Sequence, residues 1–135
     1  MALPNGSGGY QVNSGNLTEA VLSVQTIPTT LTGDTTLTAA QVANGLVVCK
    51  KASDATLTIT LPTAAALDAA IPSAKVGSSF ELTITNSNNT GSSSTVPITT
   101  GTGITIFGNV TVAQFGGSTY RFVKTGDAAY SAFLK

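Results

Sequence analysis

The chain has 135 residues, of which 41% are hydrophobic and 9% charged, and its six basic and six acidic side chains cancel to a formal net charge of zero. This length and apolar content suffice for one domain with a buried core, whereas the lack of a long basic run argues against nucleic acid as a partner. The chain has no histidine, no tryptophan and one cysteine, which excludes Ser-His-Asp and Cys-His triads, His/Cys zinc sites and an internal disulfide. We therefore expect a protein that is not an enzyme and has no cofactor or metal.

The N-terminus has neither the basic segment nor the apolar core of a signal peptide, and no stretch approaches the ~20 apolar residues of a membrane span. We expect a soluble protein, made in a reducing cytoplasm, with no membrane partner. Cys49 lies in the apolar run 46–49, which predicts a small buried hydrophobic residue and not a reactive thiol.

Residues 1–36 differ in composition from the rest of the chain. Several glycines and two prolines interrupt them, and no Lys or Arg precedes Lys50. Their apolar residues are too many for a solvated tail, so we predict an extended N-terminal arm that lies on a neighbouring subunit or on another protein. The alternative is that residues 16–27 form the first strand of the domain. The candidate partner-contacting residues are Tyr10, Leu17, Val21, Leu22, Val24 and Ile27.

The predicted domain spans residues 37–135 and begins with a short helical turn. Thr38 can cap a turn over residues 39–43, and Asn44 with Gly45 can end it, because both residues tolerate positive φ. Residues 46–49 then read as a strand. In the alternative, Asn44 and Gly45 form the tip of a hairpin.

The clearest pattern lies in residues 55–71. Leu57, Ile59 and Leu61 alternate with threonines, as in a half-buried strand. Pro62 ends the strand, Thr63 can cap an Ala-rich helix, and Pro72 stops it. In the next strand Phe80, Leu82 and Ile84 share one face, and we expect this face to meet that of Leu57, Ile59 and Leu61 in one core.

Residues 86–95 contain no apolar side chain and predict a mobile surface loop. Five short strands follow, separated by turns rich in Gly, Asn and Asp, at residues 96–100, 104–107, 110–115, 119–124 and 129–134. Such spacing predicts an all-β fold, an antiparallel β-sandwich or jelly-roll-like barrel with one or two short helical turns. Most of the late aromatic residues are expected in the core, namely Tyr120, Phe122, Tyr130 and Phe133.

Only carboxylates are left as catalytic parts, and each fits a solvated surface role: Glu19, Asp34, Asp54, Asp68, Glu81 and Asp127. The sequence Gly101-Thr102-Gly103 could be mistaken for a phosphate-binding loop. No helix with a downstream Lys follows it, so a turn between strands explains it better.

The segments LTAAQVANGLVVCK, ATLTITLPTAAALDAAIP, VGSSFELTITNS and GTGITIFGNVTVAQFGGSTYRFVKTG together resemble a β-domain of tailed-bacteriophage virion proteins, particularly capsid decoration proteins. The similarity covers residues 37–134, and the opening MALPNGSGGYQVNSGNL is similar to the N-termini of small virion proteins. The resemblance implies a virion structural protein on the capsid surface, made in the host cytoplasm and attached through the N-terminal arm.

Two functions remain open. In the first, a decoration or cement protein binds the major capsid protein, and a low-charge, Thr-rich surface suits a homotrimer. In the second, the chain belongs to a tail or vertex (fibre or spike), and the loops at residues 86–95 and 116–118 recognise a receptor or glycan. Because those loops contain no aromatic residue, the first function is favoured.

Overall fold

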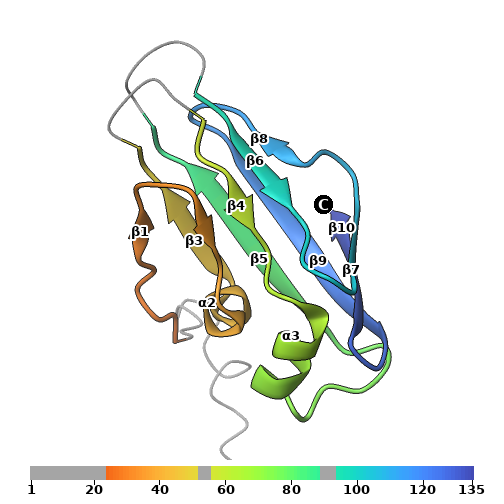
Figure 1. Cartoon of the computed structure of the whole chain (residues 1–135). Coiled ribbons are helices and arrows are strands. Elements are labelled where there is room, and N and C mark those ends of the chain that lie inside the picture. The colour runs from red at the N-terminus through yellow and green to blue at the C-terminus, as the bar shows by residue number, and fades with distance from the viewer. Residues whose placement is uncertain (1–23, 52–55, 89–93) are drawn as a thin grey trace, which may run out of the picture.

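The computed structural model describes residues 24–51, 56–88 and 94–135, which form mostly strands in two mixed sheets, with two short helices (Figure 1). The six-stranded sheet has the order β1-β3-β5-β9-β10-β7 and the four-stranded sheet the order β2-β4-β6-β8. The elements, in chain order, are β1 (Thr30–Leu31), β2 (Thr35–Thr36), α2 (Ala39–Asn44), β3 (Leu46–Cys49), β4 (Ile59–Thr60), α3 (Ala64–Ala70), β5 (Ser79–Asn86), β6 (Val96–Thr99), β7 (Ile104–Phe107), β8 (Thr111–Val112), β9 (Gly117–Gly126) and β10 (Ala129–Leu134).

The expected β-rich fold is confirmed, but the sheets are mixed and not purely antiparallel as expected. Strands β1, β3 and β5 pair in parallel, as do β2, β4 and β6, and β7 pairs in parallel with β10. The antiparallel pairs are β5 with β9, β9 with β10, and β6 with β8. The parallel pairs arise because the chain alternates between the two sheets from β1 to β9, so that β1, β3 and β5 enter their sheet in the same direction, as do β2, β4 and β6. The choice between sandwich and jelly-roll-like barrel stays a prediction.

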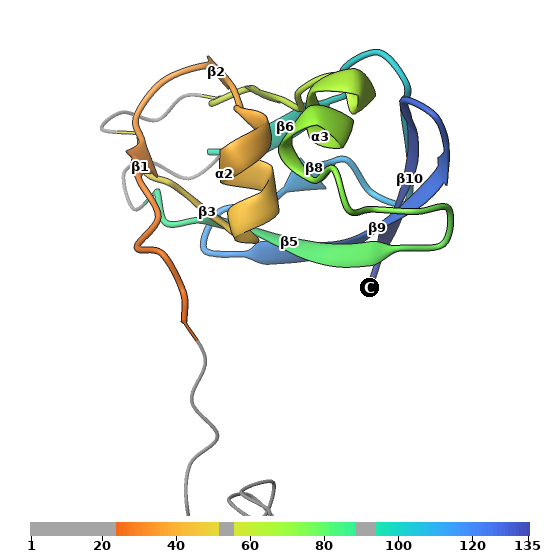
Figure 2. The ribbon, with the colours of Figure 1, turned by 90° about the horizontal axis from the view of Figure 1, so that it is seen from below.

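Both predicted helix caps are present. The Thr38 hydroxyl accepts a hydrogen bond from the Gln41 N–H, and Gln41 in turn accepts one from the Thr38 N–H, which completes a capping box. The Thr63 hydroxyl accepts from the Ala66 N–H at the start of α3. Gly45 ends α2 with φ of 83°, so the hairpin alternative is wrong. Both helices and the four-stranded sheet lie on one side of the six-stranded sheet (Figure 2).

The predicted core is confirmed. Leu57, Ile59 and Leu61 are buried together with Leu82 and Ile84, and Phe80 packs against the same cluster. Phe80 also stacks on Phe122, with ring centroids 5.1 Å apart. Of the late aromatic residues, Tyr120, Phe122 and Tyr130 are buried as expected, whereas Phe133 is 43% exposed.

The described part of the predicted arm joins the domain earlier than residue 37. Thr30 and Leu31 pair with β3, and Thr35 and Thr36 pair with β4. Leu31 is buried in the core, because its strand completes the edge of the six-stranded sheet. Residues 30–36 thus supply one short strand to each sheet.

The chain from residue 86 to residue 115 differs from its prediction at both ends. Asn86 belongs to β5, and Asn86, Asn88 and Ser94 are buried, linked by side-chain hydrogen bonds, so the two ends of this loop form a polar cluster and not a surface tip. Residues 89–93 lie outside the described residues. The strand predicted over residues 110–115 is reduced to Thr111–Val112, because the chain turns at residues 113–116 with Phe115 at φ of 56°.

Cys49 is fully buried at the end of β3, as predicted, and burial raises the pKa of its thiol to about 11. At pH 8 almost no thiolate forms and none reaches solvent. We expect Cys49 to react with a thiol reagent such as Ellman's reagent at least about a hundredfold more slowly in the folded chain than in urea. Equal rates in the two conditions would contradict this burial.

Candidate attachment surface

The first part of the candidate surface is the segment that precedes β1. Val24 is 100% exposed and Ile27 is 89% exposed, although both side chains are branched and apolar. Four other predicted partner-contacting residues, Tyr10, Leu17, Val21 and Leu22, lie outside the described residues. Two of the six candidates therefore have a described position, and both present apolar surface to solvent.

Two amide side chains hold this segment against the C-terminal end of α2. The Gln25 side chain donates to the Asn44 carbonyl at 3.0 Å, and the Asn44 side chain donates to the Thr26 carbonyl at 3.1 Å. These reciprocal bonds fix the backbone on either side of Gln25 and Thr26. As a result the direction in which the chain leaves the domain is set by the fold.

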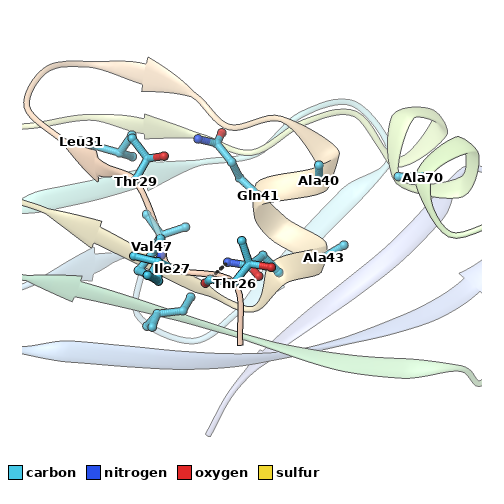
Figure 3. A pocket seen from close by; sticks show the side chains of 12 residues that line it. Thr26, Ile27, Thr29, Leu31, Ala40, Gln41, Ala43, Val47 and Ala70 are labelled. Carbon is cyan, nitrogen blue, oxygen red and sulfur yellow. Dashed lines mark hydrogen bonds between the residues drawn. The ribbon is translucent and has the colours of Figure 1, made fainter. Parts of the chain in front are cut away.

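A pocket of about 550 Å³ lies between this segment and α2 (Figure 3). Ile27 and Thr26 line it from the segment, Ala43 from α2 and Val47 from β3. No charged side chain lines the pocket, whose wall combines apolar residues with the polar side chains of Thr29, Gln41 and Asn44. The pocket thus extends the apolar surface of Ile27 onto the domain.

The second part of the surface is the outer face of the six-stranded sheet, which is the face turned away from α2 and α3. The segment before β1 leaves the domain past this same face (Figure 2). One row of paired residues crosses four strands here, namely Glu81, Arg121, Phe133 and Phe107 on β5, β9, β10 and β7. The segment at residues 24–29 and the outer face of the six-stranded sheet therefore lie on the same side of the molecule.

Charge on this face is concentrated at Glu81. Its carboxylate accepts from Arg121 at 2.6 Å and from Lys135 at 2.7 Å. These two cations, Lys135 foremost, lower the pKa of Glu81. Beside the ion pairs, Thr83 and Thr119 share a hydroxyl hydrogen bond of 2.9 Å, and Phe107 stacks on Phe133 with centroids 5.1 Å apart. The face combines neutralised charges, hydroxyls and one aromatic pair.

Asp68 does not have the solvated role expected for it. Its carboxylate accepts from the Lys124 ammonium at 2.7 Å, from the Tyr130 hydroxyl at 2.8 Å and from the Ala128 N–H at 2.8 Å. These donors, Lys124 first, lower the pKa of Asp68 to about 2. Burial, reinforced by the bond to Asp68, raises the pKa of Tyr130 to about 12. The cluster fastens α3 to β9 and β10.

The other described carboxylates are also separate from one another. Asp34 accepts from the Thr58 N–H at 2.9 Å, and Asp127 is exposed in the turn between β9 and β10. Among the described residues, no three His, Cys, Asp or Glu side chains lie close enough to hold a metal ion. No helix in the described ranges is long and apolar enough to cross a membrane.

No family model, curated protein or solved structure matches this chain. Functional arguments therefore depend on the residues and on the geometry above.

Sequence reasoning missed two elements of the site. Phe133 was expected in the core, yet Ala132 and Tyr130 are buried and Phe133 is not. The exposure of Phe133 could have been predicted from the sequence, because successive side chains of a strand point to opposite faces of the sheet. Phe133 is three residues after Tyr130, so the two side chains lie on opposite faces. The Asp68 cluster had no comparable signal, since Asp68 and Lys124 are 56 positions apart and meet only when α3 packs on β9.

Proposed function

We propose that this chain is a non-enzymatic structural protein of a phage virion, a capsid decoration or cement protein that binds the major capsid protein. The observation that carries the proposal is the exposure of Val24 and Ile27 in a segment held at its base by Gln25. The resemblance of residues 37–134 to virion β-domains supports the same role. In this proposal the chain is made in the host cytoplasm and ends on the capsid surface.

The proposed attachment depends physically on several apolar side chains of the N-terminal arm becoming buried against the capsid. A fully buried Val or Ile side chain stabilises a contact by roughly 1.5–3 kcal/mol. Because residues 24–29 and the outer face of the six-stranded sheet lie on one side of the molecule (Figure 2), both can touch the same shell. Contacts to two shell subunits must break together when the shell opens, which strengthens the joint beyond either contact alone.

The fold type belongs to the same proposal. The four-stranded sheet lies over the six-stranded sheet, and residues of both contribute to one core cluster. We assign an open sandwich and not a closed barrel, since β7 and β1 end the larger sheet without pairing to each other.

The double variant Val24→Ser with Ile27→Ser tests the arm. Both side chains are almost fully exposed, so the fold should stay intact while attachment to particles depleted of this chain weakens by at least about a hundredfold. The matched control is Val76→Ser, which removes a 70% exposed valine from the segment between α3 and β5. Attachment of the double variant with the wild-type affinity would refute the role of the arm.

The copy number of the chain per purified phage particle decides between capsid and tail. Quantitative mass spectrometry against the major capsid protein gives this number. A count on the order of hundreds supports decoration, because the capsid repeats its subunits by icosahedral symmetry. A count of about a dozen assigns the chain to a tail or vertex.

A specific observation favours that second function, recognition of a receptor or glycan. Phe115 is 71% exposed, is held in a left-handed backbone conformation, and lines a pocket of about 510 Å³ with Asn86, Ser87 and Gly116. The loops named for recognition thus have an aromatic neighbour. An exposed ring beside the exposed Ser87 can supply both stacking and a hydroxyl to a sugar, and low copy number would make this site the main functional one.

A further inference from the structure

The edge of the six-stranded sheet at β7 presents apolar surface, of which Phe107 and Phe133 also belong to the outer face described above. Phe107 is 52% exposed, Val110 40% and Phe133 43%. Phe107 and Phe133 stack in adjacent strands, and Val110 follows β7 in the chain. We call these residues, with Thr105 and Ile106 of β7, the β7-edge surface.

The backbone of β7 is ready to pair with another strand. No further strand of the described chain pairs with β7 beyond β10. The Tyr130 N–H donates to the Gly103 carbonyl at 2.9 Å, so the backbone polar groups of Gly103 point towards β10. Every second residue of a strand has the same backbone orientation, so those of Thr105 and Phe107 also point towards β10. The N–H and carbonyl of Ile106 therefore point away from the sheet, and β7 has neither a Pro nor a charged residue to block pairing.

The β7-edge surface is also rigid. The Tyr120 hydroxyl donates to the Asn109 carbonyl at 2.6 Å, and the Asn109 side chain accepts from the Thr111 N–H at 3.0 Å. Gly108 has φ of 126°, and a Cβ there would lie 2.5 Å from that of Leu134. The loop that carries Val110 is therefore fixed against β10, which reduces the entropy lost on binding.

The charge distribution identifies the occupant as a second copy of the chain. Around a twofold axis identical groups face each other, so any charge near the axis repels its own copy. No charged residue occurs from Leu82 to Tyr120, which includes all of β6, β7 and β8. In a chain with twelve charged residues, this uncharged stretch contains the edge strand β7, and Arg121 in the same row lies two strands away from Phe107.

We propose that two copies associate by antiparallel pairing of β7 with β7 about a twofold axis. Opposed residues must lie on the same face of the joined sheet, which places Ile106 opposite Ile106 of the second copy, and Thr105 opposite Phe107. A groove of about 490 Å³ beside β7, lined by Ile98, Ile104 and Val110 among others, receives the isoleucine side chains of the second copy. The sheet then continues from one subunit into the next, and the association does not rest on the proposed virion role.

The test is the molar mass of the full chain in solution, by light scattering on a size-exclusion column. We expect the wild type at twice its 13.5 kDa chain mass. Thr105→Lys places like charges across the axis at an exposed position and should weaken dimerisation at least about tenfold. Thr36→Lys is the matched control, because Thr36 is an exposed threonine on β2, an edge strand of the other sheet, and it should leave the dimer unchanged.

A charge pairing completes the test. Mixing Thr105→Lys with Thr105→Glu should restore a dimer that neither variant forms alone, since opposite charges then lie diagonally across the axis, as close neighbours on one face of the joined sheet. A second disruptive variant, Phe107→Ser, should also dissociate the dimer without loss of the circular-dichroism signal. A monomeric wild type, a dimer that both edge variants leave intact, or a trimer would each overturn the proposal, because β7-to-β7 pairing closes at two copies.

Discussion

Alanine in place of Gly101 or Gly103 should destabilise the domain by about 3 kcal/mol or more, measured as the free energy of unfolding in urea. The two glycines lie where the chain crosses from β6 in one sheet to β7 in the other. A Cβ on Gly101 would lie 2.3 Å from the Pro62 carbonyl oxygen. Gly103 has φ of 86°, and a Cβ there would lie 2.4 Å from the Ala128 carbonyl oxygen and 2.8 Å from the Ala64 Cβ.

The obstruction is backbone and not flexible side chain, so the structure cannot relax cheaply around it. The crossing also carries two backbone bonds, from the Ala64 N–H to the Thr102 carbonyl and from the Tyr130 N–H to the Gly103 carbonyl. Gly33→Ala is the matched control. Gly33 lies in the loop between β1 and β2 with nothing within 4 Å of the new methyl group, and its substitution should change stability by less than about 0.5 kcal/mol. If the Gly103→Ala variant had the same free energy of unfolding as the wild type, the close backbone contact at Gly103 would be disproved.

Asp68→Asn should lower the midpoint of thermal unfolding at pH 7 by on the order of 10 °C. The amide keeps the shape of the side chain but removes the charge opposite Lys124, which is 8% exposed. A buried ammonium without its counter-charge opposes folding more strongly than the lost hydrogen bond alone. Glu81→Gln is the control, because its pairs with Arg121 and Lys135 are exposed and contribute little in water.

The same carboxylate predicts a pH dependence. The pKa of Asp68 is about 2 in the folded chain, against 3.8 for an unperturbed aspartate, so the unfolded chain takes up this proton first on acidification. The stabilisation by Asp68 is complete above about pH 4 and disappears as the pH falls to about 2. Thermal unfolding followed by circular dichroism should show a steeper decline of the wild-type midpoint in this window than of the Asp68→Asn midpoint. Parallel curves would contradict the lowered pKa.

Local structure was predictable because its causes are local. The caps Thr38 and Thr63, and the alternation of Leu57, Ile59 and Leu61, act within a few residues and were correctly assigned. Pairing direction was not predictable from short connections. A short connection shows that the next strand lies near, but it does not show whether that strand belongs to the same sheet or to the other one. In this chain β4 belongs to the other sheet, and β3 and β5 become parallel neighbours.

The candidate surface divides in the same way. Composition identified Val24 and Ile27 as apolar residues outside the core, and both are exposed. The face shared by Glu81, Arg121, Phe133 and Phe107 depends on the register of four strands, which no local pattern fixes. Phe115 was assigned to a strand because its neighbours alternate, whereas a turn at residues 113–116 exposes it.

The alternation of strands between the two sheets has a consequence for how the chain folds. The central strand β9 joins β5 to β10 and follows all the strands of the four-stranded sheet in the chain. Most native pairings therefore join distant parts of the chain, a topology that slows folding to the range of milliseconds to seconds. On the ribosome the domain has to wait for its C-terminal hairpin, after which both sheets can close in a single cooperative step.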